Sequence, residues 1–101
     1  MITRIGVQPI IVAGSPAAGR QSYVVTSMDG EIEVASPNSV TCTNDLSLAG
    51  NMNVVHWDGS EAPFRVYKAV EGTYGFIGET NDKRLIDANI LPDISKQPPS
   101  A

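Results

Sequence analysis

Short runs of alternating hydrophobic and polar residues recur along this chain. A period of two is typical of β-strands, whose successive side chains point to opposite faces, and no segment has the period of a helix. Clusters of Gly, Pro, Asp and Asn separate the runs and predict turns, and Asp29-Gly30 is a strong hairpin signal. The runs that predict strands are residues 4–13, 21–28, 31–35, 40–43, 51–57, 64–69, 73–79 and 84–87.

These runs predict an all-β fold. About seven strands, spaced roughly ten residues apart and joined by turn signals, are typical of an antiparallel two-sheet sandwich. A chain of 101 residues has the size of a single domain, and we expect the sandwich to occupy residues 1–91. Residues 92–101 are rich in Pro, and we expect them to form an extended or disordered tail.

The alternation also predicts which side chains form the core. On the strand that begins at Phe64, Phe64 and Val66 share one face and Tyr67 lies on the opposite face. In the return strand of the predicted hairpin, Ile32 and Val34 point inward. The predicted core residues are Tyr23, Val25, Val55, Trp57, Phe64, Val66 and Phe76.

The charge and hydropathy of the chain argue against two classes of partner. Its net charge is −4 and its Lys and Arg residues are dispersed, whereas affinity for nucleic acids comes largely from clustered basic side chains. No apolar run reaches the roughly 20 residues that a membrane-spanning helix needs. We therefore expect neither a nucleic-acid partner nor a membrane partner.

Residues suited to catalysis or metal binding are few. Cys42 and His56 are the only residues of their kinds, so the sequence predicts neither an intrachain disulfide nor a zinc site nor an activated nucleophile. Carboxylates at Asp82, Asp87 and Asp93 match no calcium-binding loop in their spacing, and we expect them to be solvated turn residues. The sequence therefore predicts no enzyme, no cofactor and no metal.

The aromatic half of the chain resembles a known family. Trp57 closing one strand, FRVYK at residues 64–68 and GTYGFIGET at residues 72–80 look like the B, C and C′ strands of a fibronectin type III-like domain. IDANILPD at residues 86–93, followed by Pro98-Pro99, is more specific. It resembles a version of that domain found inside tail and other virion structural proteins of tailed bacteriophages.

Upstream segments fit the same family. Residues 44–51 follow the family in the same order, and the resemblance covers residues 20–99. The segment SYVVT at residues 22–26 looks like the sixth strand of a type III domain, yet here it precedes Trp57. The chain is therefore a permuted or shifted sandwich, or a domain completed by a neighbouring subunit.

The resemblance implies a non-enzymatic structural component of a phage virion. It would be made in the bacterial cytoplasm, lie in the tail or head–tail region, and contact other virion proteins and copies of itself. Sheet edges and crossing segments are the expected means of contact, because edge strands carry unpaired backbone groups. The interface candidates are Pro9, Ile10, Tyr67, Tyr74, Pro92, Ile94 and Pro98.

A carbohydrate-binding or host-adhesion module is the alternative function. Exposed tyrosine rings on a β-sandwich can stack on sugar rings, because the faces of the tyrosine ring are apolar while its hydroxyl can form hydrogen bonds. This alternative would use exposed Tyr67 and Tyr74 together with surface carboxylates, and its ligand would be a glycan of the host surface.

Overall fold

The computed structural model describes residues 1–12, 19–70 and 72–99. Residues 13–18, 71, 100 and 101 lie outside this description, and with them the end of the first predicted strand and the end of the predicted tail. In the described residues there is no helix long and apolar enough to cross a membrane. Their eight strands are β1 (Ile2–Ile10), β2 (Gly19–Asp29), β3 (Ile32–Ala35), β4 (Val40–Asn44), β5 (Met52–Gly59), β6 (Phe64–Val70), β7 (Thr73–Thr80) and β8 (Arg84–Asp87).

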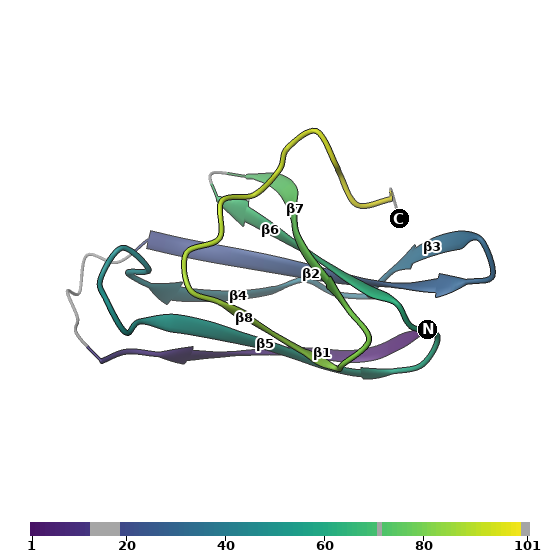
Figure 1. Ribbon diagram of the computed structural model, residues 1–101, viewed down its shortest axis with the longest axis horizontal. Helices are drawn as coiled ribbons and strands as arrows, with labels where there is room; N and C mark the ends of the chain where they lie inside the picture. Colours follow the sequence, from purple (N-terminus) through teal and green to yellow (C-terminus); the bar gives the residue numbers. More distant parts are fainter. Residues whose placement is uncertain (13–18, 71, 100–101) are drawn as a thin grey trace.

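The strands form two sheets that pack face to face (Figure 1). One sheet has the order β1-β5-β8, and the other has the order β3-β2-β6-β7 with β4 also paired to β2. Every strand pair is antiparallel. The prediction of an all-β fold with two antiparallel sheets is therefore confirmed, with eight strands in the described residues.

The core lies between the two sheets. Trp57 of β5 and Phe64 of β6 meet there edge to face, with ring centroids 5.7 Å apart. Both sheets contribute aliphatic side chains around this pair. Six predicted core residues are at most 3% exposed: Tyr23, Val25, Val55, Trp57, Phe64 and Val66.

The predicted core position of Phe76 is wrong. Phe76 is only half-buried and lies against Tyr67, with ring centroids 5.9 Å apart. The register of β6 and β7 shifts, because Val66 pairs with Gly78 while Tyr67 pairs with Phe76. Ile77 is thus the extra residue of a bulge, and it enters the core in place of Phe76.

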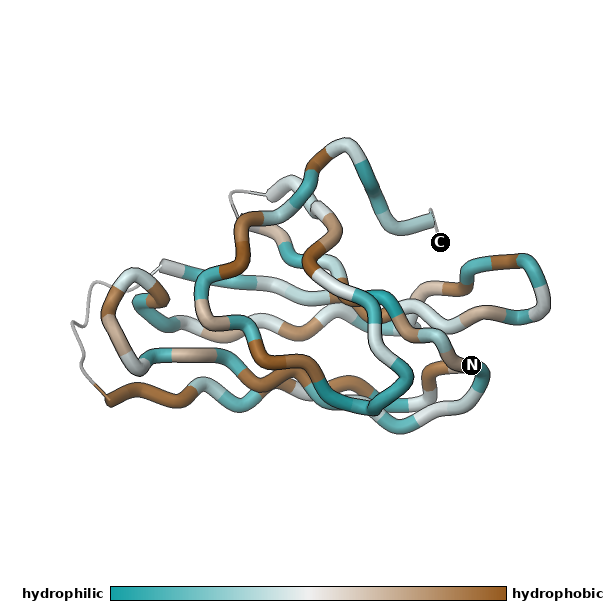
Figure 2. Tube along the Cα trace, viewed as in Figure 1, coloured by the Kyte–Doolittle hydropathy of each residue, from teal (hydrophilic) through white to brown (hydrophobic). Residues whose placement is uncertain are grey.

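The inward position predicted for Ile32 is also wrong. Ile32 is 68% exposed, and Val34 is half-buried. The hairpin of β2 and β3 projects from the body of the sandwich (Figure 1), so its tip has no facing sheet to bury a side chain. Figure 2 shows hydrophobic positions along this hairpin and along the C-terminal segment as well as along the strands of both sheets.

Candidate functional site

The C-terminal segment lies against the edge of the larger sheet. We call residues 91–99 the C-terminal arm. The Phe76 N–H donates to the Asp93 carbonyl at 3.1 Å, and the Asp93 N–H donates to the Phe76 carbonyl at 2.9 Å. This isolated antiparallel bridge joins the arm to β7, the last strand of its sheet.

A glycine permits the arm to approach β7 closely. A Cβ atom at Gly75 would lie 2.8 Å from the Pro92 Cβ and 2.9 Å from the Asp93 carbonyl carbon. Real side chains do not tolerate such distances, and the Asp93 obstacle is backbone that cannot rotate away. Any larger residue at Gly75 would therefore displace the arm.

The arm turns after the bridge and passes over Phe76. The Asp93 carboxylate accepts hydrogen bonds from the Ser95 hydroxyl at 2.6 Å and the Ser95 N–H at 3.1 Å, which lower the pKa of Asp93. The Lys96 ammonium lies 5.2 Å from the centre of the Phe76 ring, within the range of a cation–π contact.

An open groove of about 610 Å³, which we call the outer groove, lies between the arm and the outer face of the larger sheet. The groove is lined by charged and polar side chains around the Tyr67 and Phe76 rings. Its lining residues are Glu33, Arg65, Tyr67, Phe76, Glu79, Ser95, Lys96 and Gln97.

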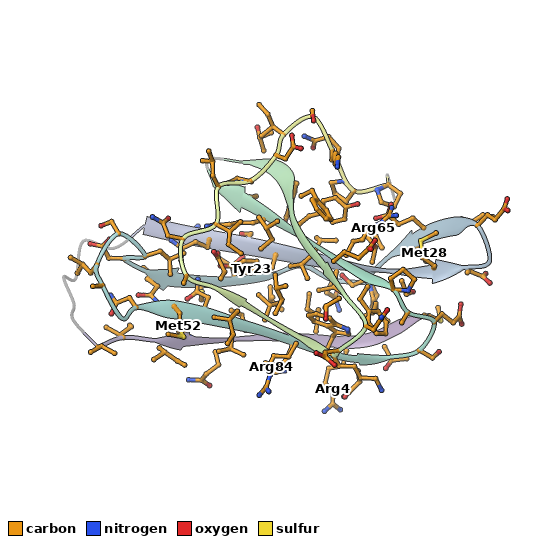
Figure 3. All side chains as sticks on the ribbon, viewed as in Figure 1. Arg4, Tyr23, Met28, Met52, Arg65 and Arg84 are labelled. Atoms are coloured by element: carbon orange, nitrogen blue, oxygen red, sulfur yellow. The ribbon has the colours of Figure 1, made fainter. Side chains whose placement is uncertain are left out.

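The charges on the sheet side of the groove are paired. Arg65, which is labelled in Figure 3, contacts Glu33 through Nη1 at 3.0 Å and Glu79 through Nε at 2.9 Å. Glu33 also accepts hydrogen bonds from the Tyr67 hydroxyl and from the Thr26 hydroxyl, the latter at 2.6 Å. These ionic and polar contacts join β2, β3, β6 and β7 across the sheet surface.

The pairing shifts two pKa values in opposite directions. Burial acts to raise the pKa of Glu33, but hydrogen bonds from Thr26 and Tyr67 and the charge of Arg65 outweigh it, so the pKa is lowered. Burial, reinforced by the hydrogen bond to Glu33, raises the pKa of Tyr67 to about 12. At neutral pH the carboxylate is therefore ionised and the phenol protonated, which suits a structural hydrogen bond rather than proton transfer.

The two tyrosines proposed as interface residues lie in different grooves. Tyr67 is 3% exposed, so the ring offers no face for stacking. Tyr74 is half-buried and lines a second open groove of about 560 Å³ together with Arg20 and Ser22. The structure thus separates the two residues that the glycan-binding alternative would use together.

The other interface candidates lie on both sheets. Pro9 and Ile10 end β1 in the smaller sheet, and Ile10 is 38% exposed. The arm carries Pro92 and Pro98, both half-buried, and Ile94, which is 64% exposed. The arm candidates gather at the edge of the larger sheet, whereas the β1 candidates belong to the smaller sheet.

A buried ion pair joins the two sheets. Lys68 of β6 and Asp87 of β8 are 2% and 0% exposed, and the Lys68 ammonium lies 2.9 Å from Asp87 Oδ2. The Tyr23 hydroxyl donates to the same oxygen at 2.6 Å. The backbone N–H groups of Asn89 and Ile90 donate to Oδ1 at 3.1 and 2.7 Å. We call Tyr23, Lys68 and Asp87 the buried pin.

The expectation that Asp87 is a solvated turn residue is wrong. Its carboxylate is surrounded by donors from both sheets because β8 ends inside the sandwich, opposite β6. The sequence carries one signal for this pair: Lys68 follows Val66 by two residues and therefore shares the core face of β6.

Further polar side chains extend the buried pin along the core. Asn53 donates to the Tyr23 hydroxyl at 2.7 Å and to Gln21 at 3.1 Å, and Asn44 donates to Asn53 at 3.0 Å. Burial raises the pKa of Tyr23, and the neighbouring Asp87 adds to the increase. These hydrogen bonds join β2, β4 and β5 through their side chains, and the buried Asn44 Oδ1 has no hydrogen-bond partner among the described residues.

The remaining reactive residues lie apart from these features. Cys42 is half-buried beside the core, and burial raises the pKa of the thiol. His56 is exposed on the smaller sheet, where its ring covers Gly6. Residues 1–12, 19–70 and 72–99 contain no group of three His, Cys, Asp or Glu side chains that could hold a metal ion.

No family model, curated protein or solved structure matches this chain.

Proposed function

We propose that this chain is a non-enzymatic structural component of a tailed-bacteriophage virion and acts through protein–protein contacts in the tail or head–tail region. The observation that carries the proposal is the contact between YGFIGET and DANILPD, the two specific segments of the resemblance. YGFIGET lies within β7, and DANILPD runs from the end of β8 to the start of the arm. They meet at the Phe76–Asp93 bridge, so the residues of the resemblance build one feature: a sheet edge with an arm laid on it.

The strand neighbours support an immunoglobulin-like sandwich of the fibronectin type III kind. In such sandwiches strand C lies beside F in one sheet, and strands A, B and E belong to the other. By the resemblance β5, β6 and β7 correspond to B, C and C′, and β2 corresponds to F. Here β6 lies between β2 and β7, and β5 lies between β1 and β8, as that correspondence requires.

The same correspondence favours a permuted or shifted sandwich over a domain completed by a neighbouring subunit. The F-like strand β2 precedes the B-like strand β5, yet it lies within the same chain beside β6. In an ordinary sandwich the chain runs directly from E to F, with a tyrosine near the start of F binding back across that corner. Here the Tyr23–Asp87 hydrogen bond supplies a contact between the F-like strand and the end of β8, the E-like strand.

Exposed apolar residues and sheet edges support an assembly role. Leu91 is 88% exposed and Ile94 is 64% exposed, and they flank the bridge at Asp93. Apolar side chains left uncovered beside a sheet edge are suited to contact with another protein. Leu91 and Ile94 offer other virion proteins or copies of the chain an apolar surface at this edge of the larger sheet.

Sedimentation of particles tests the proposed function. In a lysate of infected cells, the chain should travel with intact particles, and mass spectrometry of its peptides should identify it there. A variant that lacks residues 92–101 should keep its fold, judged by the fluorescence of Trp57, and should lose incorporation. Recovery of the unaltered chain only in the soluble fraction, or normal incorporation of the truncated chain, would contradict the proposal.

A carbohydrate-binding or host-adhesion module is the second candidate, and the groove beside Tyr74 is the observation that favours it. Titration with glycans of the host surface should then show saturable binding that Tyr74→Ala abolishes. Tyr67→Phe is the matched control, because the Tyr67 ring is buried and would contact no sugar. Absence of any binding would eliminate this candidate.

A further inference from the structure

The arm is fixed to the sandwich at its root and attached loosely beyond it. Asp87 holds the N–H groups of Asn89 and Ile90, and the Lys68 ammonium donates to the Ile90 carbonyl at 3.0 Å. Beyond Ile90, the backbone joins β7 only at the bridge to Phe76, within the part of the chain that the structure describes. The root is therefore immobilised, whereas the arm leaves β7 by breaking two backbone hydrogen bonds and the contacts of Pro92 and Lys96.

Prolines at both ends of the arm restrict its backbone. Pro92, Pro98 and Pro99 each fix one backbone dihedral angle, and Leu91 is restricted to extended conformations because a proline follows it. Hydrogen bonds that Ser95 and Lys96 donate to Asp93 also hold the turn within the arm. A segment whose backbone is already restricted loses little conformational entropy when it binds elsewhere. The arm is thus suited to project from its own sandwich and bind another.

The edge that the arm occupies is shaped for this particular sequence. Gly75 leaves room for Pro92, the Phe76 backbone pairs with Asp93, and the Phe76 ring lies beneath Lys96. A second copy of the chain carries the same edge and the same arm. An exchanged arm would therefore form every one of these contacts again, which is the condition for exchange of an identical element between protomers.

We infer that the arm is exchanged between copies: residues 91–99 of one copy bind along β7 and the outer groove of a second copy. The inference rests on the proposed function, because it supplies the self-contact of the assembly. Exchange also brings the roots of two arms together, where Leu91 and Ile94 can be covered. When each arm passes to the next copy in one direction, the contact is head to tail and generates a ring or a helical array.

Two single-cysteine variants test the exchange. Phe76→Cys and Asp93→Cys are each made in a Cys42→Ser background, mixed, unfolded and refolded together, and then oxidised. Antiparallel residues that exchange both hydrogen bonds have Cα atoms about 5.5 Å apart, a separation that a disulfide spans. A molecule whose arm lies on its own β7 carries only one cysteine and cannot form this disulfide within itself. A specific disulfide between the two variants therefore requires the arm of one copy to lie on β7 of the other.

A mixture of Asp93→Cys with Thr3→Cys, in the same background, is the control, because Thr3 is exposed on the other sheet. Arm docking should hold the thiols at about millimolar effective concentration, so at about 0.1 mM protein roughly ten-fold more heterodimer is expected than in the control. Equal yields would overturn the exchange.

A second measurement avoids the loss of the Phe76 ring. Native mass spectrometry of the unaltered chain at rising concentration should show dimers or larger species, and Gly75→Ala should abolish them. Monomers alone in both proteins would overturn the exchange. A chain that sediments with particles but does not exchange refutes only this inference, whereas a chain absent from particles refutes the proposed function whatever the disulfide yield.

Discussion

Replacement of Lys68 by methionine is the most informative perturbation of this fold. Methionine keeps a long unbranched side chain but removes the ammonium that lies 2.9 Å from Asp87 Oδ2 and 3.0 Å from the Ile90 carbonyl. Asp87 would remain buried with the Tyr23 hydroxyl and two backbone N–H groups as donors. The variant thus leaves a buried carboxylate without its countercharge.

The expected loss is large relative to the stability of a chain this size. Removing one partner of a buried ion pair costs about 3–5 kcal/mol. The three donors that remain on Asp87 favour the lower end, about 3 kcal/mol. Domains have unfolding free energies of about 5–15 kcal/mol, so the variant should lose a substantial fraction of its stability. The midpoint of thermal unfolding should fall by about 12–24 °C, since about 4–8 °C accompanies each kcal/mol in a domain of this size.

Urea unfolding measured by the fluorescence of Trp57 is a suitable assay, because Trp57 is 3% exposed in the core. Arg65→Met is the matched control. Arg65 also bridges carboxylates, but on the partly exposed surface, where an ion pair contributes about 0–1 kcal/mol. The double variant Lys68→Met/Asp87→Asn removes both charges, and its unfolding free energy should be at least about 1 kcal/mol greater than that of Lys68→Met.

Two results would refute this reasoning. A loss for Lys68→Met no greater than that for Arg65→Met would mean that the ammonium and carboxylate are hydrated in solution. A double variant less stable than Lys68→Met would mean that the uncompensated charge is not the source of the loss.

Three further predictions concern the outer groove and the arm. The pKa of Glu33 in the native state lies below 4.5. Its ionised form therefore stabilises the fold above pH 4.5, and this contribution is lost as pH falls through the lower native pKa. In Glu33→Gln, the unfolding free energy should therefore fall less steeply as pH decreases below 4.5 than it does in the unaltered chain. An unchanged slope would contradict this. Because the pKa of Tyr67 is raised from 10.0 to about 12, its contribution is present below pH 10 and lost as pH rises towards 12. Absorbance titration should show a phenol with a midpoint near 12 that Tyr67→Phe removes, and its persistence would refute the assignment. Gly75→Ala should speed hydrogen exchange at the Asp93 amide, because the added methyl group displaces the arm. Gly19→Ala is the control and should leave this exchange unchanged, because a Cβ atom has room there. Equal protection of the Asp93 amide in both variants would show that the arm tolerates the methyl group.

Local pattern was enough to predict the strands and most of the core. A strand with one face buried must alternate, so runs such as the one ending at Trp57 predicted both the element and its inward side chains. Asp29-Gly30 likewise predicted a hairpin, and Gly30 takes a positive φ of 64° there. These features depend on neighbours in the chain, which is why they are visible in the sequence.

The buried pin, the bulge and the arm contact depended on partners far away in the chain. Alternation placed Lys68 on the core face but could not supply Asp87, whose burial requires β8 to end opposite β6. Ile77 replaced Phe76 in the core because the pairing of β7 with β6 shifts by one residue, and such a shift depends on both strands. Gly75 acquired its role only when Pro92 approached. A residue sequence states which side chains are apolar or charged, whereas the free energy of burying a charge or packing a backbone depends on what the fold brings against it.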